Sequence, residues 1–373
     1  MRGSVVNKKG KWYIAVYFGM VAGKRKYKWY SGYSSREEAE TDLPNIMLDV
    51  QKGIVVDTST MNARQFFDLW LEEHVSPNTT GSTYDKYSAA AKSASAVFGH
   101  EKIQKLKPVS VQRWINQLAK DGKSKGTITS YYTAVKSAFN KALQWQMITH
   151  TPCLNITTPK QKKKTMRTLS AEEVTQLLAT AEGTPMHLVI LLAAGCGLRR
   201  GEILGLTWKD IDLENRVIHV TEALTQNSTG VKMAELKTEG SHRSVDINDS
   251  VKQAMKRQIS AQETFIRESR GNVVDIKKRI DMNDVHVCAW QDNVRIRPDY
   301  VTKSFPKILK MAELPKIRFH DLRHTHATLL LKAGVHPKIV QERLGHSNIK
   351  ITMNTYSHVL PSMQREAAEI LVF

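Results

Sequence analysis

The sequence is poor in cysteine and has no long hydrophobic run. Its three cysteines, Cys153, Cys196 and Cys288, are widely spaced among 373 residues and form no C-x-x-C pair. This pattern supports neither a disulfide framework nor a zinc ribbon, so we expect a reducing, cytoplasmic compartment. No apolar run approaches the ~18 residues that a bilayer span requires. No signal-type segment follows Met1, and a membrane partner is not expected.

Acidic residues are scarce relative to basic ones. The chain has 55 Lys and Arg against 36 Asp and Glu, which gives a formal net charge of +19. That excess favours a polyanionic partner such as nucleic acid. A charge that only maintains solubility is the alternative. The clustering argues against it, because residues 8–28 hold seven Lys or Arg and no acidic residue.

Residues 1–56 are predicted to form a three-stranded sheet followed by a helix. Residues 12–18 and 24–30 are rich in aromatic and β-branched residues, and Ser35 and Glu38 have capping-box spacing. Basic residues interleaved with aromatic ones favour a sheet that binds a DNA groove, whereas a solvated hairpin with an aromatic mini-core is the alternative. The expected DNA-binding residues are Lys8, Lys9, Lys11, Lys24, Arg25, Lys26 and Lys28.

The rest of the chain is predicted to be mainly α, with small β-sheets. Apolar residues at helical spacing indicate a bundle of helices over residues 62–158. The next segment is so basic that it has little reason to fold alone, and we expect a tether that crosses a DNA backbone. A larger, mostly helical domain is predicted over residues 166–373. The tether's expected DNA-binding residues are Lys160, Lys162, Lys163 and Lys164.

Three β-type runs interrupt the helices of this last domain. They span residues 216–221, 231–237 and 243–247, and we expect them to form one small antiparallel sheet. Lys237 then lies at or near the turn before the third strand. A lone lysine in a hairpin is usually solvated, so only its order relative to other motifs gives it a functional interpretation.

Residues 319–328 (FHDLRHTHAT) contain side chains suited to chemistry on a phosphate. Read as a helix, they place His320 and Arg323 on one face, which we expect to point outward. The planar guanidinium of arginine matches phosphate oxygens, and histidine moves a proton near neutral pH. Tyr356 follows His346 by ten residues and is a candidate nucleophile.

A zinc site is the alternative interpretation of these histidines. His320 and His324 are four residues apart, which suits two metal ligands on one helix, and His326 lies close by in the sequence. The sequence has no His-Glu-x-x-His motif and no cysteine near this segment. We therefore expect no metal.

The order of these motifs resembles that of the tyrosine recombinases. Gly-Leu-Arg-x-x-Glu at residues 197–202 comes first, followed by Lys237, the His-x-x-Arg pair, Leu-Gly-His at residues 344–346, and Tyr356. The layout is most similar to integrases of phages and integrative elements. The resemblance implies an arm-binding domain (1–56), a core-binding domain (62–158) and a catalytic domain (166–373), with Glu202 as support for the first arginine. The implied catalytic residues are Arg199, Lys237, His320, Arg323, His346 and Tyr356.

The resemblance also implies a reaction and a set of partners. DNA strands would be cut and rejoined through a covalent 3′-phosphotyrosyl intermediate, without ATP, metal or another cofactor. Expected partners are double-stranded DNA at core and arm attachment sites, further copies of the chain in a homotetramer, and accessory excision and host DNA-bending proteins in a bacterial cell. A type IB topoisomerase and an inactive DNA-binding regulator are alternatives. The arm-type N-terminal domain argues against the first, and the complete residue set argues against the second.

Overall fold

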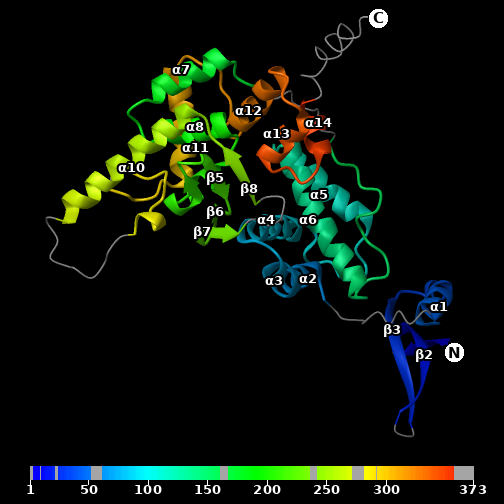
Figure 1. Ribbon diagram of the computed structural model, residues 1–373. Helices are drawn as coiled ribbons and strands as arrows, with labels where there is room; N and C mark the ends of the chain where they lie inside the picture. Colours follow the sequence, from blue (N-terminus) through cyan, green and yellow to red (C-terminus); the bar gives the residue numbers. More distant parts are fainter. Residues whose placement is uncertain are drawn as a thin grey trace, which may run out of the picture. The chain divides into compact units, whose positions relative to one another are not determined.

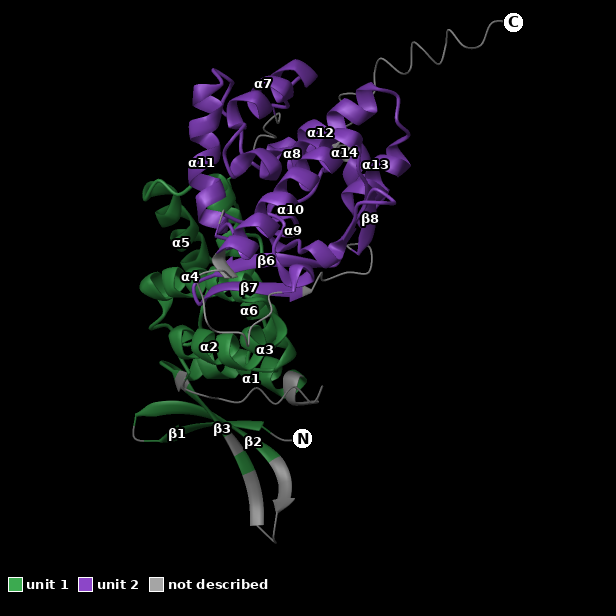
Figure 2. Ribbon diagram, turned by 60° about the vertical axis from the view of Figure 1, so that its left-hand side comes forward, with its two compact units in different colours: residues 1–162 green, residues 163–373 purple. Residues whose placement is uncertain are grey.

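The computed structural model consists of two compact units, residues 1–162 and residues 163–373 (Figures 1 and 2). The structure describes residues 3–8, 10–21, 24–51, 61–159, 167–235, 242–270, 281–290 and 292–356. The expected DNA-binding residues Lys9, Lys160, Lys162, Lys163 and Lys164 and the hairpin residue Lys237 lie outside the described residues.

The N-terminal sheet is an antiparallel meander of β1 (Gly3–Lys8), β2 (Lys11–Val21) and β3 (Lys24–Tyr33), followed by α1 (Arg36–Gln51). Because side chains alternate across a strand, Ile14 and Val16 share one face, where they pack with Ala39 of α1. The predicted cap is shifted by one residue. Ser35 Oγ accepts from the Glu38 amide at 3.1 Å, but the Glu38 carboxylate returns to Ser34.

The opposite face of this sheet carries an aromatic row. Tyr13, Tyr17, Tyr27 and Trp29 form edge and tilted ring contacts with centroids 5.5–6.5 Å apart. Tyr27 is 42% exposed and Trp29 is 39% exposed. The predicted aromatic mini-core is therefore present in part, since Trp12 and Tyr30 pack toward α1, while Tyr27 and Trp29 of this row stay exposed.

A helical bundle completes the first unit, as predicted. Its core is aromatic: Phe66 stacks on Phe139 at 5.8 Å between ring centroids, and Phe98 meets Trp114 edge-on at 6.2 Å. Asn62 begins the first helix with a capping box to Gln65. The elements are α2 (Ala63–Trp70), the π-helix η1 (Leu71–Val75), α3 (Ser76–Asn78), α4 (Gly81–Phe98), α5 (Pro108–Lys120) and α6 (Lys125–Gln144).

The second unit is built around α8 (Met186–Cys196), whose almost entirely apolar sequence is buried. The helix ends at Gly197, which adopts a left-handed backbone with φ of 69°. A β-carbon there would stand 2.6 Å from Cδ2 of His326, so the turn requires glycine. The other helices are α7 (Ala171–Ala181), α9 (Arg200–Gly205), η2 (Trp208–Asp210), α10 (Asp249–Arg270), η4 (Met282–Asp284), α11 (Pro298–Met311), α12 (Asp321–Lys332), α13 (Pro337–Leu344) and α14 (Ile349–Tyr356).

The prediction of a single small sheet in this unit is wrong. β5 (Val217–Val220) pairs with β4 (Ile211–Asp212) and β8 (Arg243–Asp246), while β7 (Gly230–Glu235) pairs with β6 (Glu222–Asn227) in a separate sheet. β6 was not predicted because its residues are mostly polar. The residues of β6 alone do not predict a strand, and β6 forms one because it pairs with β7.

Candidate active site

Arg199 lies where the buried α8 gives way to α9. It is the N-cap residue of α9, with an extended backbone. Its amide donates to Oε2 of Glu202 at 2.8 Å, and its Nη1 donates to Oε1 of the same carboxylate at 2.6 Å. A further donor, Nη2, reaches the carbonyl of Gly345 at 3.1 Å. These contacts fix the guanidinium group, and the side chain is still 37% exposed, so it remains accessible.

Glu202 is a buried anion shared by two arginines. Its side chain is 1% exposed, and Arg243 donates to Oε1 at 3.1 Å and to Oε2 at 2.8 Å. Burial by itself would raise the pKa of Glu202. The hydrogen bonds and charge of Arg243, with those of Arg199, outweigh burial and lower the pKa to about 2. The carboxylate is therefore ionised at neutral pH, and the expected support of Arg199 by Glu202 is present.

Arg323 does not point outward, which corrects the prediction for the His-x-x-Arg face. The residue is 2% exposed. Its Nη1 donates to the carbonyl of Gly197 at 2.7 Å, and its Nη2 donates to the carbonyl of Leu344. The α12 helix places it there because α12 packs against α8. Arg323 therefore joins the ends of α8 and α13.

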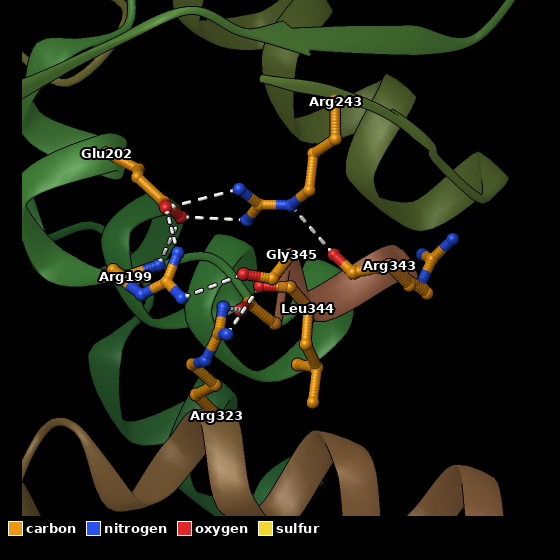
Figure 3. A network of polar contacts seen from close by, with 8 residues as sticks. Arg199, Glu202, Arg243, Arg323, Arg343, Leu344 and Gly345 are labelled. Atoms are coloured by element: carbon orange, nitrogen blue, oxygen red, sulfur yellow. Dashed lines mark hydrogen bonds and ion pairs between the residues drawn. The ribbon is translucent and has the colours of Figure 1, made fainter. Parts of the chain in front are cut away.

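The C-terminal end of α13 is the point on which the arginines converge (Figure 3). The carbonyls of Arg343, Leu344 and Gly345 accept from Arg243, Arg323 and Arg199 respectively. The last carbonyls of a helix have no partner within the helix and carry partial negative charge. Three cations therefore hold this helix end immediately before His346.

His320 and His324 face each other at the start of α12. Their rings meet edge-on with centroids 5.1 Å apart. Loss of hydration, followed by the charge of Arg323, lowers the pKa of His320. Loss of hydration and the neighbouring His320 lower the pKa of His324 to about 4. Both rings are therefore neutral near pH 7, and His320, which is exposed, can accept a proton.

His346 follows the left-handed Gly345 and is half-buried. Its Nδ1 and the hydroxyl of the buried Thr352 on α14 are 2.9 Å apart. Burial, then the charges of Arg323 and Arg199, lower the pKa of His346 to about 4. A neutral imidazole has one N–H and one lone pair, so the hydrogen bond with Thr352 is coupled to which ring nitrogen of His346 carries the hydrogen.

Tyr356 is the last residue of α14, one short loop and two helical turns beyond His346. Lys237 lies outside the described residues, and Arg243 begins β8 six positions later. Among the expected arm residues, Lys8 and Lys11 are exposed, and the Lys8 ammonium stands 3.4 Å from the ring centroid of Trp29. Lys24, Arg25, Lys26 and Lys28 lie on β3.

Arg243 and Arg343 were not predicted to belong to the site, and His326 was considered only as a metal ligand. His326 is not available to a metal, because both of its ring nitrogens are bound. Nδ1 lies 2.8 Å from the Ala194 carbonyl, and Nε2 accepts from Nε of Arg343 at 3.2 Å. In the part of the chain that the structure describes, no group of three or more His, Cys, Asp or Glu side chains is placed to hold a metal ion.

Family models match three parts of the chain. The phage integrase family model matches residues 167–363, more than half of the chain. A phage integrase N-terminal SAM-like domain matches residues 64–119, and an arm DNA-binding domain matches residues 4–49.

Individual relatives extend over most of the sequence. A protein named tyrosine recombinase XerC-like, from Caldanaerobacter subterraneus subsp. tengcongensis, is 32% identical over 368 residues, which cover 94% of this chain and 92% of that protein. The ICEBs1 integrase of Bacillus subtilis is 28% identical over 282 residues, covering 75% of this chain and 74% of the integrase.

Solved structures agree with the fold. The Tn1549 transposon integrase in complex with a circular intermediate DNA superposes with a TM-score of 0.69 and 26% identity, covering 84% of this chain and 100% of that one. A lambda integrase dimer bound to a COC′ core site has a TM-score of 0.59 at 16% identity, covers 94% of each chain, and supports the fold alone. With its fold, its arginine site and the family match over more than half its length, this chain belongs to the phage integrase family and is a tyrosine recombinase.

Proposed function

We propose that Arg199 and His346 hold the scissile phosphate, that the buried Arg323 adds its positive charge to the site, and that Tyr356 is the nucleophile and Lys237 the general acid. The chain is a site-specific DNA recombinase whose partner is double-stranded DNA. The observation that carries the residue roles is the convergence of two guanidinium groups on the helix end next to His346 (Figure 3). Such fixed donors stabilise the charge that gathers on a phosphate during displacement.

The proposed cleavage step balances in bonds and protons. A tyrosine hydroxyl in a model peptide has a pKa of ~10, so the proton of Tyr356 must leave as it attacks, and the neutral His320 accepts it. A bond forms between the Tyr356 oxygen and phosphorus, and the bond from phosphorus to the 5′-oxygen breaks. Lys237 gives the 5′-oxygen its proton. The phosphoester energy remains in the 3′-phosphotyrosyl bond, so a second 5′-hydroxyl reverses the step without ATP.

The proposed assembly assigns one role to each of three parts of the chain. Residues 1–56 would bind arm sites through the basic and aromatic face of the sheet, residues 62–158 would bind core sites, and residues 166–373 would cut. Recombining two duplexes takes four cleavages, which we assign to a homotetramer aided by accessory excision and host DNA-bending proteins. We further propose that the reaction takes place on DNA in the cytoplasm of a bacterial cell. None of the helices among the described residues is long and apolar enough to cross a membrane.

A leaving-group experiment tests the assignment of Lys237. Lys237→Ala should cut ordinary core DNA slowly, by a factor of about 100 or more. On DNA with a 5′-bridging phosphorothiolate the variant should recover, because sulfur leaves without a proton. Tyr356→Phe provides the control, since it should form no adduct on either substrate. A Lys237→Ala variant that stays slow on the phosphorothiolate would remove the general-acid role.

A further inference from the structure

Arg243 is a deeply enclosed charge beside the candidate site. It begins β8, and its side chain is only 6% exposed. A charge buried this deeply is stable only with matched partners. Its two terminal nitrogens bind both oxygens of Glu202, and its Nε donates to the carbonyl of Arg343 at 2.9 Å. Arg243 is thus fixed on two elements, α9 and α13.

The charge balance of this cluster depends on Arg243. The single carboxylate of Glu202 lies between the guanidinium groups of Arg199 and Arg243 (Figure 3). With both arginines present the cluster carries a net positive charge. Without Arg243, the negative charge of Glu202 would be balanced by Arg199 and would neutralise its positive charge, because screening is weak in this buried setting. Arg243 therefore keeps the positive charge of Arg199 available to an incoming phosphate.

The side chain of Arg243 also supports the backbone that leads to His346. A β-carbon on Gly345 would stand 3.0 Å from Cδ and 3.1 Å from Nη1 of Arg243. Gly345 has φ of 62°, which ends α13 in a left-handed turn. The guanidinium and its methylene stem therefore fill the space directly beneath this turn. A shorter side chain at position 243 would leave the turn without its support.

We propose that Arg243 is a positioning residue of the recombination reaction, one that fixes Glu202 behind Arg199 and the end of α13 before His346. Its burial keeps it away from DNA, so it acts only through those neighbours. The inference rests on the roles proposed for Arg199, His346 and Tyr356. It predicts that loss of Arg243 slows cleavage while binding of core DNA is retained.

The first test compares Arg243→Gln and Arg243→Lys with wild type. Core-DNA affinity, helical content and the rate of covalent protein–DNA adduct formation are measured at matched folded concentration. Arg243→Gln should form the adduct about 100-fold more slowly, the scale for losing one charge-stabilising donor, with DNA affinity within about threefold of wild type. The adduct rate of Arg243→Lys should lie between those of wild type and Arg243→Gln, because lysine keeps the positive charge but lacks the paired donors of the guanidinium group. Arg297→Gln is the control, since the side chain of Arg297 is 67% exposed and pairs with Asp299, and it should match wild type.

The second test separates electrostatic positioning from simple packing. In Arg243→Gln/Glu202→Gln the carboxylate charge is removed together with its partner, so Arg199 regains its free positive charge. The double variant should form the adduct about tenfold faster than Arg243→Gln alone. A purely structural role predicts a further loss instead, and that result would overturn the electrostatic part of the proposal.

The outcomes distinguish this inference from the proposed function. No Tyr356 adduct in wild type contradicts the proposed function. A normal adduct rate in Arg243→Gln contradicts only the inference. If Arg243→Gln does not fold, Arg243→Lys decides: slow cleavage at unchanged DNA affinity supports the positioning role, and a wild-type rate overturns it.

Discussion

Nε of Arg343 donates a hydrogen bond of 3.2 Å to Nε2 of His326, and this contact fixes the state of the histidine. An arginine nitrogen can only donate, so Nε2 must be unprotonated and Nδ1 carries the hydrogen toward the Ala194 carbonyl. Arg343 continues to the carbonyl of Asp246 at 2.8 Å. His326 thereby ties α8, α12, α13 and β8 together, and it does so only while it is neutral.

Stability should therefore depend on pH through His326. Burial and then the charge of Arg343 lower its pKa to about 4, against an unfolded value of ~6.5. Between these values the unfolded chain binds more protons than the folded one, so stability falls as the pH drops from ~6.5 toward 4. The loss for this group reaches at most about 3 kcal/mol. Urea unfolding at pH 7.5 and pH 5 measures it, and His326→Gln should flatten the slope. An equal slope in that variant would assign the effect elsewhere.

Gly345 and Gly334 form a matched pair that isolates the contact with Arg243. Both have left-handed backbones, with φ of 62° and 79°, but a β-carbon on Gly334 meets nothing within 4 Å. Gly334→Ala should cost about 1–2 kcal/mol for the backbone alone. Gly345→Ala adds a clash with the Arg243 side chain, about 1–3 kcal/mol more. Thermal unfolding gives the difference, and adduct formation should slow only in Gly345→Ala. Equal effects of the two substitutions would contradict this packing.

The hydroxyl of Thr352 should set the tautomer of His346. If Thr352 donates to Nδ1, Nε2 keeps its hydrogen for the phosphate. Thr352→Val removes the donor at nearly constant volume and should slow adduct formation about tenfold. Thr328→Val is the control, because Oγ1 of the buried Thr328 has no hydrogen-bond partner within the described ranges. That variant should keep its rate. An unchanged rate in Thr352→Val would remove Thr352 from the site.

Lys8 and Trp29 should contribute to arm-site binding and not to core cleavage. The ammonium of Lys8 lies over the exposed Trp29 ring. Lys8→Ala should weaken arm-site binding. It should also reduce the slope of log K against log salt by about one, as expected for the loss of one phosphate contact. Cleavage of DNA that contains only core sites should be unchanged. Arm binding measured between 50 and 200 mM salt, about the range in which such contacts are resolved, checks the slope. A slope equal to that of wild type would exclude a Lys8–phosphate contact.

The helices and strands that were predicted correctly from the sequence are those that local patterns determine. The helical bundle and the three-stranded N-terminal sheet are both present in the structure. Each depends on residues within a few positions of one another, where periodicity and cap chemistry act.

Contacts between distant residues could not be read in this way. The burial of Arg323 depends on the Gly197 carbonyl, 126 positions away, and Arg343 meets Arg243 100 positions away. The sequence marks these arginines as charged, and charged residues are usually exposed. The packing of α12 on α8 brings a carbonyl to Arg323, and the packing of α13 beside β8 brings one to Arg243. One signal was available for Gly197 and Gly345, because glycine directly after a helix indicates a left-handed cap.

The central claim is that Tyr356 attacks the DNA within the arginine site. The most direct measurement traps wild-type protein on a nicked core-site substrate without metal or nucleotide, digests the complex, and identifies the DNA-linked peptide by mass spectrometry. The account predicts a single adduct, on Tyr356 through a 3′-phosphate, that is absent from Tyr356→Phe. An adduct on another residue, a 5′-phosphate linkage, or an adduct that persists in Tyr356→Phe would contradict it.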